Sequence, residues 1–172
     1  MDFERELGLN QTILFLMPSE NYNDDIVEVL KELEGNICYV TLNKTYDSLI
    51  ELFKRNKVST KNIVFIDAIS RTIKNVPDQS EDVYYVSSPA ALTELSIVIE
   101  KFIKHNFDYV IFDSLTNLLI YEKKAPVAKF VSSLVNKIKN GKTRALFYAL
   151  SIKEQDELIK QTSMFVDKVI QL

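Results

Sequence analysis

The sequence predicts a three-layer α/β/α fold, in which helices cover both faces of a mainly parallel β-sheet. Two observations predict this fold class. Short runs of β-branched and aromatic residues alternate with amphipathic stretches of helical period, as they do in β-α-β units. In addition, the runs Ile63–Ile66 and Tyr109–Phe112 are apolar at every position, which is typical of strands that are buried on both faces of a parallel sheet.

The predicted strands are short and mostly apolar, and they are rich in valine, isoleucine and aromatic residues. Runs of this length are typical of strands, whereas helices are usually longer. In chain order the predicted strands are Thr12–Met17, Ile37–Leu42, Asn62–Asp67, Val83–Val86, Tyr109–Asp113, Arg144–Leu150 and Val166–Gln171.

Helices are predicted between the strands, where apolar residues recur with helical spacing. The first predicted helix, Asp24–Glu34, has Asn23 as a natural N-cap and ends before Gly35, a residue type that often follows a helix. Residues 1–10 are predicted to form an N-terminal tail and residues 71–82 a surface loop. The other predicted helices are Thr45–Lys57, Pro89–His105, Val127–Lys139 and Lys153–Met164.

Composition and charge limit the classes of function. With 172 residues, of which 47% are hydrophobic, the chain is expected to form a single domain over residues 1–172. The net charge of −3 gives no general attraction to nucleic acid or to anionic membranes. The lone cysteine, Cys38, and the lone histidine, His105, exclude an intrachain disulfide and the usual zinc sites. We therefore expect a cytoplasmic protein that binds neither nucleic acid nor membrane.

The segment after the first predicted strand lacks the features of a phosphate-binding loop. Such a loop needs glycines for close backbone approach and usually a lysine as counter-charge. The segment Pro18–Asn23 has neither, and the next helix opens with Asp24 and Asp25, whose carboxylates would repel a triphosphate. Acidic residues in this position are explained by their favourable interaction with the helix dipole. The segment is therefore predicted not to bind an anion.

The predicted strand 109–113 ends in Asp113, which is followed by Ser114 and by the apolar segment Leu115–Tyr121, predicted as a turn or short helix. An apolar strand that ends in aspartate is how nucleotide hydrolases place a carboxylate beside Mg²⁺, and Ser114 could add a hydroxyl ligand. An aspartate at the end of a buried strand can equally cap the following turn. Asp113 and Ser114 are therefore the candidate nucleotide-binding and metal-binding residues, and both interpretations stay open.

A second aspartate, Asp67, ends the predicted strand 62–67 in the same way. Together with Asp113, Asp24 and Asp25 it could form an acidic Mg²⁺ pocket of the kind that accepts a phosphoryl group in receiver domains. That arrangement requires paired acids directly at the end of the first strand, where Pro18–Glu20 intervene here. It is the weaker alternative.

The segment Asp108–Leu119 (DYVIFDSLTNLL) resembles the Walker B strand of KaiC-like proteins in the RecA ATPase superfamily. Ile37–Lys44 (ICYVTLNK) resembles the second strand of that family, Ile63–Ile69 (IVFIDAI) the strand that follows, and Leu92–Ser96 the helix before Walker B. The likeness extends from about Gln11 to Leu172, and its specific motif is the Walker B segment. The resemblance implies a RecA/KaiC-like P-loop NTPase fold.

Two departures from the family pattern bear on activity. The glycine-free segment Pro18–Asn23 stands where the family has its Walker A loop with lysine and threonine or serine. The catalytic glutamate that the family places just after its second strand is also missing, because Asn43 and Lys44 follow that strand here. Of the three catalytic elements only the Mg²⁺-type carboxylate, Asp113, remains, so the residues argue against ATP hydrolysis.

Two classes of function are predicted. The first is a non-catalytic KaiC-like pseudo-ATPase without a cofactor, acting as a regulatory or scaffolding protein-interaction module. The resemblance implies self-association or docking on an active KaiC-like ATPase, and a role in archaeal-type signal transduction. The alternative is a nucleotide-binding protein or weak ATPase, with Asp113 and Ser114 holding Mg-ATP and with Lys44, or a lysine or arginine of a partner, facing the phosphates.

Overall fold

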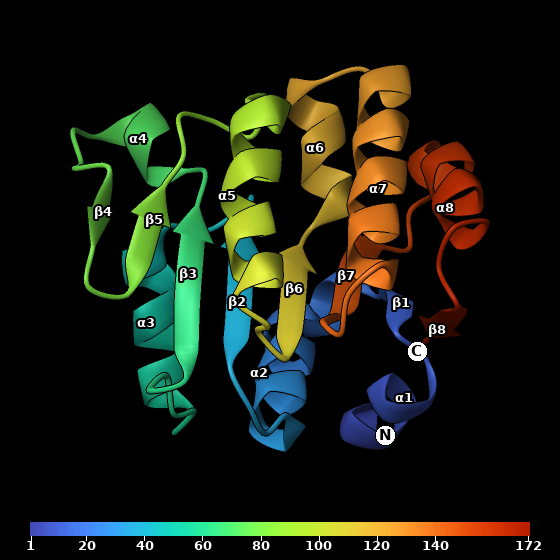
Figure 1. Ribbon diagram of the computed structural model, residues 1–172, viewed down its shortest axis with the longest axis horizontal. Coiled ribbons are helices and arrows are strands. Elements are labelled where there is room, and N and C mark those ends of the chain that lie inside the picture. The colour runs from blue at the N-terminus through green and yellow to red at the C-terminus, as the bar shows by residue number, and fades with distance from the viewer.

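The computed structural model has one eight-stranded sheet with the strand order β4-β5-β3-β2-β6-β7-β1-β8 (Figure 1). The structure describes the backbone of residues 1–172 and every side chain except that of Glu154. Neighbouring strands are parallel, except that β4 is antiparallel to β5. The strands are β1 (Thr12–Met17), β2 (Ile37–Thr41), β3 (Ile63–Asp67), β4 (Gln79–Ser80), β5 (Val83–Tyr85), β6 (Tyr109–Asp113), β7 (Arg144–Leu150) and β8 (Lys168–Gln171).

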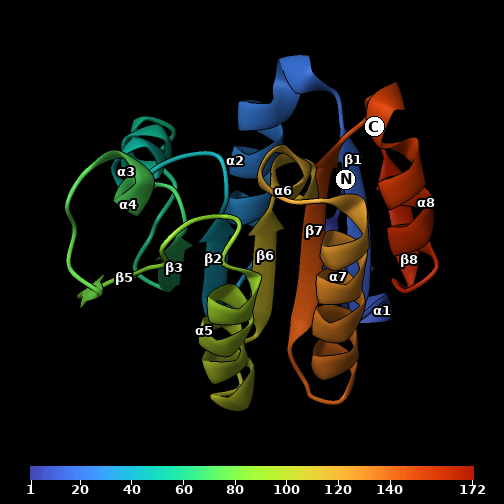
Figure 2. The ribbon, with the colours of Figure 1, turned by 90° about the horizontal axis from the view of Figure 1, so that it is seen from above.

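Helices cover both faces of this sheet (Figure 2). The helices are α1 (Phe3–Leu9), α2 (Tyr22–Glu32), α3 (Tyr46–Arg55), α4 (Ser70–Ile73), α5 (Leu92–Lys104), α6 (Leu115–Tyr121), α7 (Lys124–Lys139) and α8 (Asp156–Ser163), with short 3-10 helices at Ser19–Asn21 and Lys153–Gln155. Helices α2 and α3 lie on one face, and α5 and α7 lie on the other. The predicted fold class, a three-layer α/β/α arrangement with a mainly parallel sheet, is confirmed.

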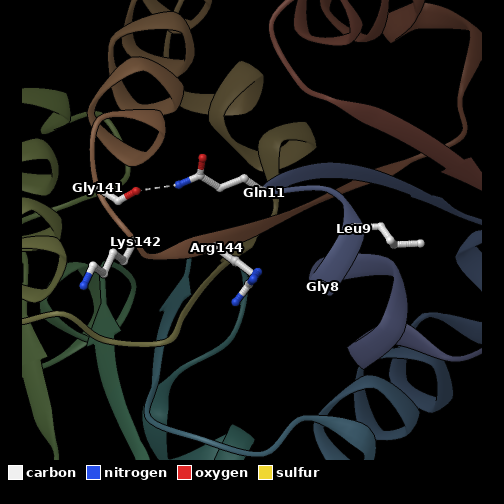
Figure 3. Close-up of a pocket in the computed structure, with 6 residues that line it drawn as sticks. All are labelled: Gly8, Leu9, Gln11, Gly141, Lys142 and Arg144. Atoms are coloured by element: carbon white, nitrogen blue, oxygen red, sulfur yellow. Dashed lines mark hydrogen bonds between the residues drawn. The ribbon is translucent and has the colours of Figure 1, made fainter.

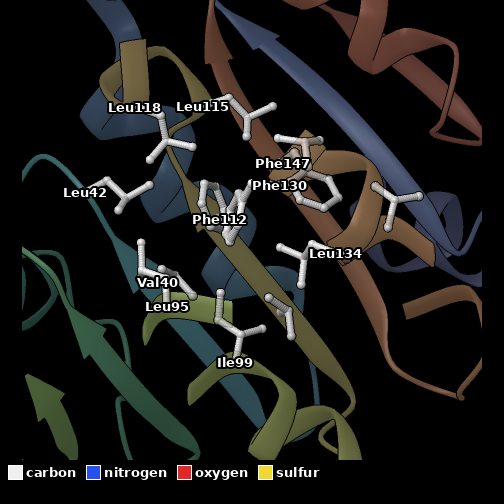
Figure 4. Packing of buried hydrophobic residues seen from close by; sticks show 14 of the residues in the cluster. Val40, Leu42, Leu95, Ile99, Phe112, Leu115, Leu118, Phe130, Leu134 and Phe147 are labelled. Atoms are coloured by element: carbon white, nitrogen blue, oxygen red, sulfur yellow. The ribbon is translucent and has the colours of Figure 1, made fainter. Parts of the chain in front are cut away.

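Two hydrophobic cores, one on each face, hold the layers together. On the face of α5 and α7, the Phe112 ring lies 5.8 Å from the Phe130 ring and 5.9 Å from the Phe147 ring (Figure 4). On the face of α2 and α3, the Phe65 ring is 5.8 Å from the Tyr39 ring. Because successive residues of a strand point to opposite faces, Phe112 belongs to the first core while Ile111 belongs to the second.

The structure corrects several predicted boundaries. Residues 1–10 do not form a tail, because α1 buries Phe3 and Leu7 in the core and the Phe3 ring contacts the Phe15 ring at 5.1 Å. The predicted surface loop 71–82 contains most of α4 and the edge strand β4. Helix α2 begins at Tyr22, so Asn23 lies inside the helix and is not its N-cap.

Among the described residues, no helix combines the length and the apolar character that a membrane crossing requires.

Candidate functional site

Asp113 lies at the carboxyl end of β6, between β2 and β7 in the interior of the sheet. In the strand register it is opposite Thr41, the last residue of β2. The segment Leu115–Tyr121 that follows it forms α6, as predicted. Asp113 therefore lies at the carboxyl edge of the sheet, the edge at which open parallel sheets bind ligands.

The Asp113 carboxyl group is fully buried and faces the core beneath α2 and α3. The Tyr39 hydroxyl donates a hydrogen bond to Asp113 Oδ2 at 2.5 Å, and Asn43 Nδ2 donates a longer one to Oδ1 at 3.4 Å. Burial raises the pKa of Asp113 well above its usual range, because a charged carboxylate is poorly solvated there. Burial therefore opposes ionisation of this carboxyl group, and it is the ionised carboxylate that binds Mg²⁺.

Ser114 is also buried, and it precedes α6. Its Oγ donates a hydrogen bond to Asn117 Oδ1 at 2.6 Å, within the first turn of that helix. The peptide bond between Asp113 and Ser114 is cis. Among the described side chains, no group of three or more acidic, histidine or cysteine residues has a geometry that could hold a metal ion.

The segment between β1 and α2 forms a 3-10 turn at Ser19–Asn21 that leads directly into the helix. Tyr22, the first residue of α2, is buried, and its hydroxyl accepts a 3.5 Å hydrogen bond from Asn43 Nδ2. Lys44 Nζ lies 5.2 Å from the centre of the Tyr22 ring, a cation-π contact. Tyr22 thus contacts the residues that follow β2, at the carboxyl edge of the sheet.

A cavity of about 300 Å³ opens beside Tyr22 at this edge of the sheet. Its charged lining groups are Lys44 and Glu20. Lys44 is half-buried, and this burial lowers the pKa of its ammonium group. Within the described side chains, no carboxylate oxygen lies within 4 Å of Lys44 Nζ. The other lining residues are uncharged, and the polar ones among them include Ser19, Asn23, Asn43 and Asn117.

Asp67 lies on the other side of Thr41 from Asp113, but its carboxylate oxygens have different hydrogen-bond partners. Oδ1 accepts hydrogen bonds from the backbone N–H groups of Ile69 and Ser70, both at 2.8 Å. Oδ2 accepts one from Tyr46 N at 2.8 Å and one from Ser70 Oγ at 2.5 Å. Asp67 therefore fastens the starts of α3 and α4 to β3, and the structure does not bring it into an acidic pocket with Asp113.

Comparison with solved structures shows the fold. The chain is similar to a KaiC-like protein from the hyperthermophilic archaeon Pyrococcus horikoshii OT3, with 10% identity, a TM-score of 0.60, and coverage of 94% of this chain and 70% of that one. A second protein of the same organism has 11% identity and a TM-score of 0.60 over 99% of this chain and 87% of that one. An ATPase of the type III secretion system of pathogenic bacteria has 15% identity and a TM-score of 0.57, over 94% of this chain and 51% of the other.

A family model matches residues 31–172. The chain belongs to the Family of unknown function (DUF7504). The comparison with curated proteins gives no match. The solved structures described above confirm the resemblance to KaiC-like and RecA-type ATPases for the fold of this DUF7504 chain.

Sequence reasoning missed the tyrosines that surround Asp113 in this DUF7504 chain. Tyr39 and Tyr148 are fully buried, and the Tyr148 ring lies 6.4 Å from the Tyr22 ring. The Tyr148 hydroxyl and Asp25 Oδ2 are buried without a hydrogen-bond partner in the described structure. Asp25 lies in the first turn of α2, as predicted, but it is buried, and burial raises its pKa with smaller contributions from Glu28 and Asp24. The signal available in the sequence was the presence of a tyrosine within each of two otherwise mainly apolar strands, β2 and β7.

A further cavity of about 470 Å³ lies near the opposite edge of the sheet in the DUF7504 chain (Figure 3). Its basic lining residues are Lys142 and Arg144. Gln11 Nε2 donates hydrogen bonds to the carbonyl oxygens of Ile138, Gly141 and Thr143 at 2.8 to 3.0 Å. The Gln11 side chain therefore satisfies carbonyl groups at and just after the C-terminal end of α7, where the helix dipole also favours basic side chains.

Proposed function

We propose that the chain is a non-catalytic KaiC-like domain that acts by binding a protein partner, in a regulatory or scaffolding role. The observation that carries this proposal is the burial of Asp113. The carboxyl group of Asp113 accepts a hydrogen bond from Tyr39 inside the core, and its burial opposes ionisation, so it does not present an exposed anionic oxygen to Mg²⁺. It would have to turn away from Tyr39 and out of the core before it could act in nucleotide chemistry.

The start of α2 supports the same proposal. Phosphoryl transfer depends on concentrated positive charge and on backbone N–H groups around the transferred group. In this chain the segment after β1 leads into α2 at the buried Tyr22, and Asp24 and Asp25 follow in the first turn of the helix. The neighbouring cavity combines the Lys44 ammonium group with the Glu20 carboxylate. Such a site lacks the net positive charge that a triphosphate requires.

Turnover and binding of Mg-ATP test the non-catalytic part of the proposal. We expect the purified chain to show no ATP or GTP hydrolysis above background. The discriminating control is Asp113→Ala, because a contaminating ATPase would be unaffected by this change. Turnover that is present in the wild type and absent in Asp113→Ala would overturn the proposal.

The partner in this proposal is a second copy of the chain or an active KaiC-like ATPase. The apolar end of α6, where Ile120 and Tyr121 are exposed, lies beyond the same edge of the sheet and is the surface at which we expect contact. Ile120→Glu should weaken the association of purified components, measured by light scattering or calorimetry, because it would bury an unpaired charge. Met164→Glu changes an equally exposed apolar residue near β8 and is the matched control. Equal effects of the two variants would remove α6 from the proposal.

Nucleotide binding without hydrolysis is the second candidate, and the uncommitted ammonium group of Lys44 in the 300 Å³ cavity favours it. A ligand present at about 100 times its Kd raises the free energy of unfolding by about 2.7 kcal/mol. Thermal unfolding with and without Mg-ATP therefore separates the two candidates. Under the second candidate Lys44→Gln abolishes the shift and Lys61→Gln, at an exposed lysine, retains it. Absence of any shift in the wild type favours the first candidate.

A further inference from the structure

Part of the sheet face that carries α5 has no helix in front of it. In Figure 1, α5 stands beside β3, and the front of β3 and β5 is open to view. A cavity of about 320 Å³ lies there, between these strands and the second half of α5. It is on the opposite face of the sheet from the Asp113 side chain, because Val64 and Tyr84 pack against the core of α5 and α7. This cavity is therefore separate from the site described above.

The floor of the cavity is aromatic. The rings of Tyr84 and Phe102 are 5.4 Å apart and almost perpendicular, and those of Phe102 and Phe107 are 4.9 Å apart in the same arrangement. Phe102 is buried, whereas Tyr84 and Phe107 are partly exposed, and Val64 completes the apolar surface. Pockets for small molecules have this composition, in which aromatic and aliphatic walls hold the ligand and a few polar groups orient it. Perpendicular rings also give a planar ligand both a ring face and a ring edge to contact.

The rim of the cavity carries charge of different sign on its two sides. Lys101 and His105 lie one turn apart on the α5 side, and Glu81 lies across from them, before β5. His105 Nδ1 is 2.6 Å from the Lys101 carbonyl oxygen, which can only accept, so Nδ1 donates and Nε2 is directed away from the backbone. Among the described side chains no carboxylate lies within 4 Å of Lys101 Nζ, whereas Lys104 and Lys137 both pair with Glu100.

We propose that this cavity binds a small aromatic carboxylate. The ring of the ligand lies on Tyr84, Phe102 and Phe107, and its carboxylate faces Lys101. Charge complementarity places the carboxylate at the α5 wall, because Lys101 offers an unpaired ammonium group there, whereas Glu81 lies on the opposite side of the rim. The cavity volume, about 320 Å³, fits a ligand of one or two fused rings and is too small for a folded partner segment.

Fluorescence anisotropy of indole-3-acetate tests the proposal on the purified chain. Because the chain contains no tryptophan, the indole of the ligand can be excited without exciting an indole of the protein. We expect a saturable rise in anisotropy. Tryptamine has the same ring with a positive charge, so it should bind roughly tenfold more weakly, since its ammonium group would face Lys101. Tryptamine binding as tight as that of indole-3-acetate, or no saturable signal up to about 1 mM ligand, would overturn the proposal.

Two pairs of variants locate the site. Lys101→Gln should weaken indole-3-acetate binding roughly threefold, as expected for an exposed charge pair, and Lys104→Gln, which changes a lysine that already pairs with Glu100, should leave it unchanged. Tyr84→Ala should weaken binding roughly tenfold, and Tyr121→Ala on α6 should not. If Tyr84→Ala fails to fold, the two lysine variants decide, because both side chains are exposed. Equal effects within each pair would refute the proposal. It would also be refuted if the chain forms a dimer that excludes indole-3-acetate and that Tyr84→Ala dissociates.

Discussion

Asp67 and Asp113 flank Thr41 at the same level of the sheet, each is the last residue of an apolar strand, and each is fully buried. Asp67 accepts four hydrogen bonds, three of them from backbone N–H groups. Asp113 accepts one from the Tyr39 hydroxyl and one long one from Asn43. Buried carboxylates need strong hydrogen-bond donors to replace water, so the surroundings of Asp67 stabilise a negative charge better than those of Asp113 do.

The difference arises from the residues that follow each strand. After β3 the chain turns at once, and the N–H groups of Ile69 and Ser70 point back at Asp67. After β6 the chain stays extended at Ser114 before α6 begins, and the Ser114 hydroxyl is used by Asn117. An aspartate at the end of a strand thus accepts several backbone N–H hydrogen bonds in one place and is buried with few donors in the other.

The largest effect that tests this comparison is expected for Asp67→Asn. The amide keeps the size of the side chain but replaces one acceptor oxygen by a donor that faces backbone N–H groups. We expect the free energy of unfolding to fall by about 3 kcal/mol, because buried hydrogen bonds to a charged group are lost and donors stay unsatisfied. Urea denaturation measures this change. A smaller loss than that of Asp113→Asn would contradict the difference drawn between the two sites.

Asp113→Asn is the matched substitution, and its effect should depend on pH. The raised pKa of Asp113 means that, above the ordinary pKa of aspartate, the folded chain retains a proton that the unfolded chain has released. The free energy of unfolding of the wild type therefore falls as pH rises through that window. Below the window, Asp113→Asn should be less stable than the wild type by about 1 to 2 kcal/mol. Because asparagine does not titrate, this deficit should shrink as pH rises.

Urea denaturation of both proteins across the acid to neutral range measures this dependence. Asp25, whose pKa is also raised by burial, stays in both proteins, so some pH dependence should remain in the variant. A deficit that is constant with pH would mean that Asp113 is already charged in the folded chain.

The sequence predicted the sheet well, because the apolar strands carry their own signal. The bounds of β1, β6 and β7 agree with the predicted runs, and Asp113 and α6 lie where the pattern placed them. Helix α1 was missed although its signals are present, since Asp2 caps it by accepting a hydrogen bond from Arg5 N at 2.9 Å and Phe3 and Leu7 are spaced by one turn. Its short length and its exposed charged residues concealed the buried pair.

The buried surroundings of Asp113 and its hydrogen bond with Tyr39 could not be predicted from the sequence. They depend on Tyr39, which is 74 residues away in the chain, and on the strand register that places β2 beside β6. The local sequences IVFID and YVIFD have the same pattern, a run of apolar and aromatic residues that ends in aspartate, so nothing in the strands themselves separates Asp67 from Asp113. Only the contacts made by distant residues and by the following turn do so.

Tyr39→Phe should have a smaller effect than either aspartate substitution. It removes the hydroxyl that donates to Asp113 while the ring keeps its contacts with Phe53 and Phe65. We expect a loss of about 1 kcal/mol, the usual net contribution of one hydrogen bond. Combining it with Asp113→Asn in a double-mutant cycle measures the coupling between the two groups. Strictly additive effects would mean that the Tyr39 hydroxyl does not act through Asp113.

The smallest effect is expected for Tyr148→Phe, the matched substitution on β7. Tyr148 is as deeply buried as Tyr39 and belongs to the same core, but its hydroxyl has no hydrogen-bond partner in the described structure. Removing an unpartnered buried hydroxyl gives up no hydrogen bond and relieves a desolvation cost, so the free energy of unfolding should change by less than about 0.5 kcal/mol or should rise. Urea denaturation of the two Tyr→Phe variants side by side makes the comparison. A loss as large as that of Tyr39→Phe would place the Tyr148 hydroxyl in the hydrogen-bonded group around Asp113, and the buried carboxyl group would then have a second tyrosine as a donor.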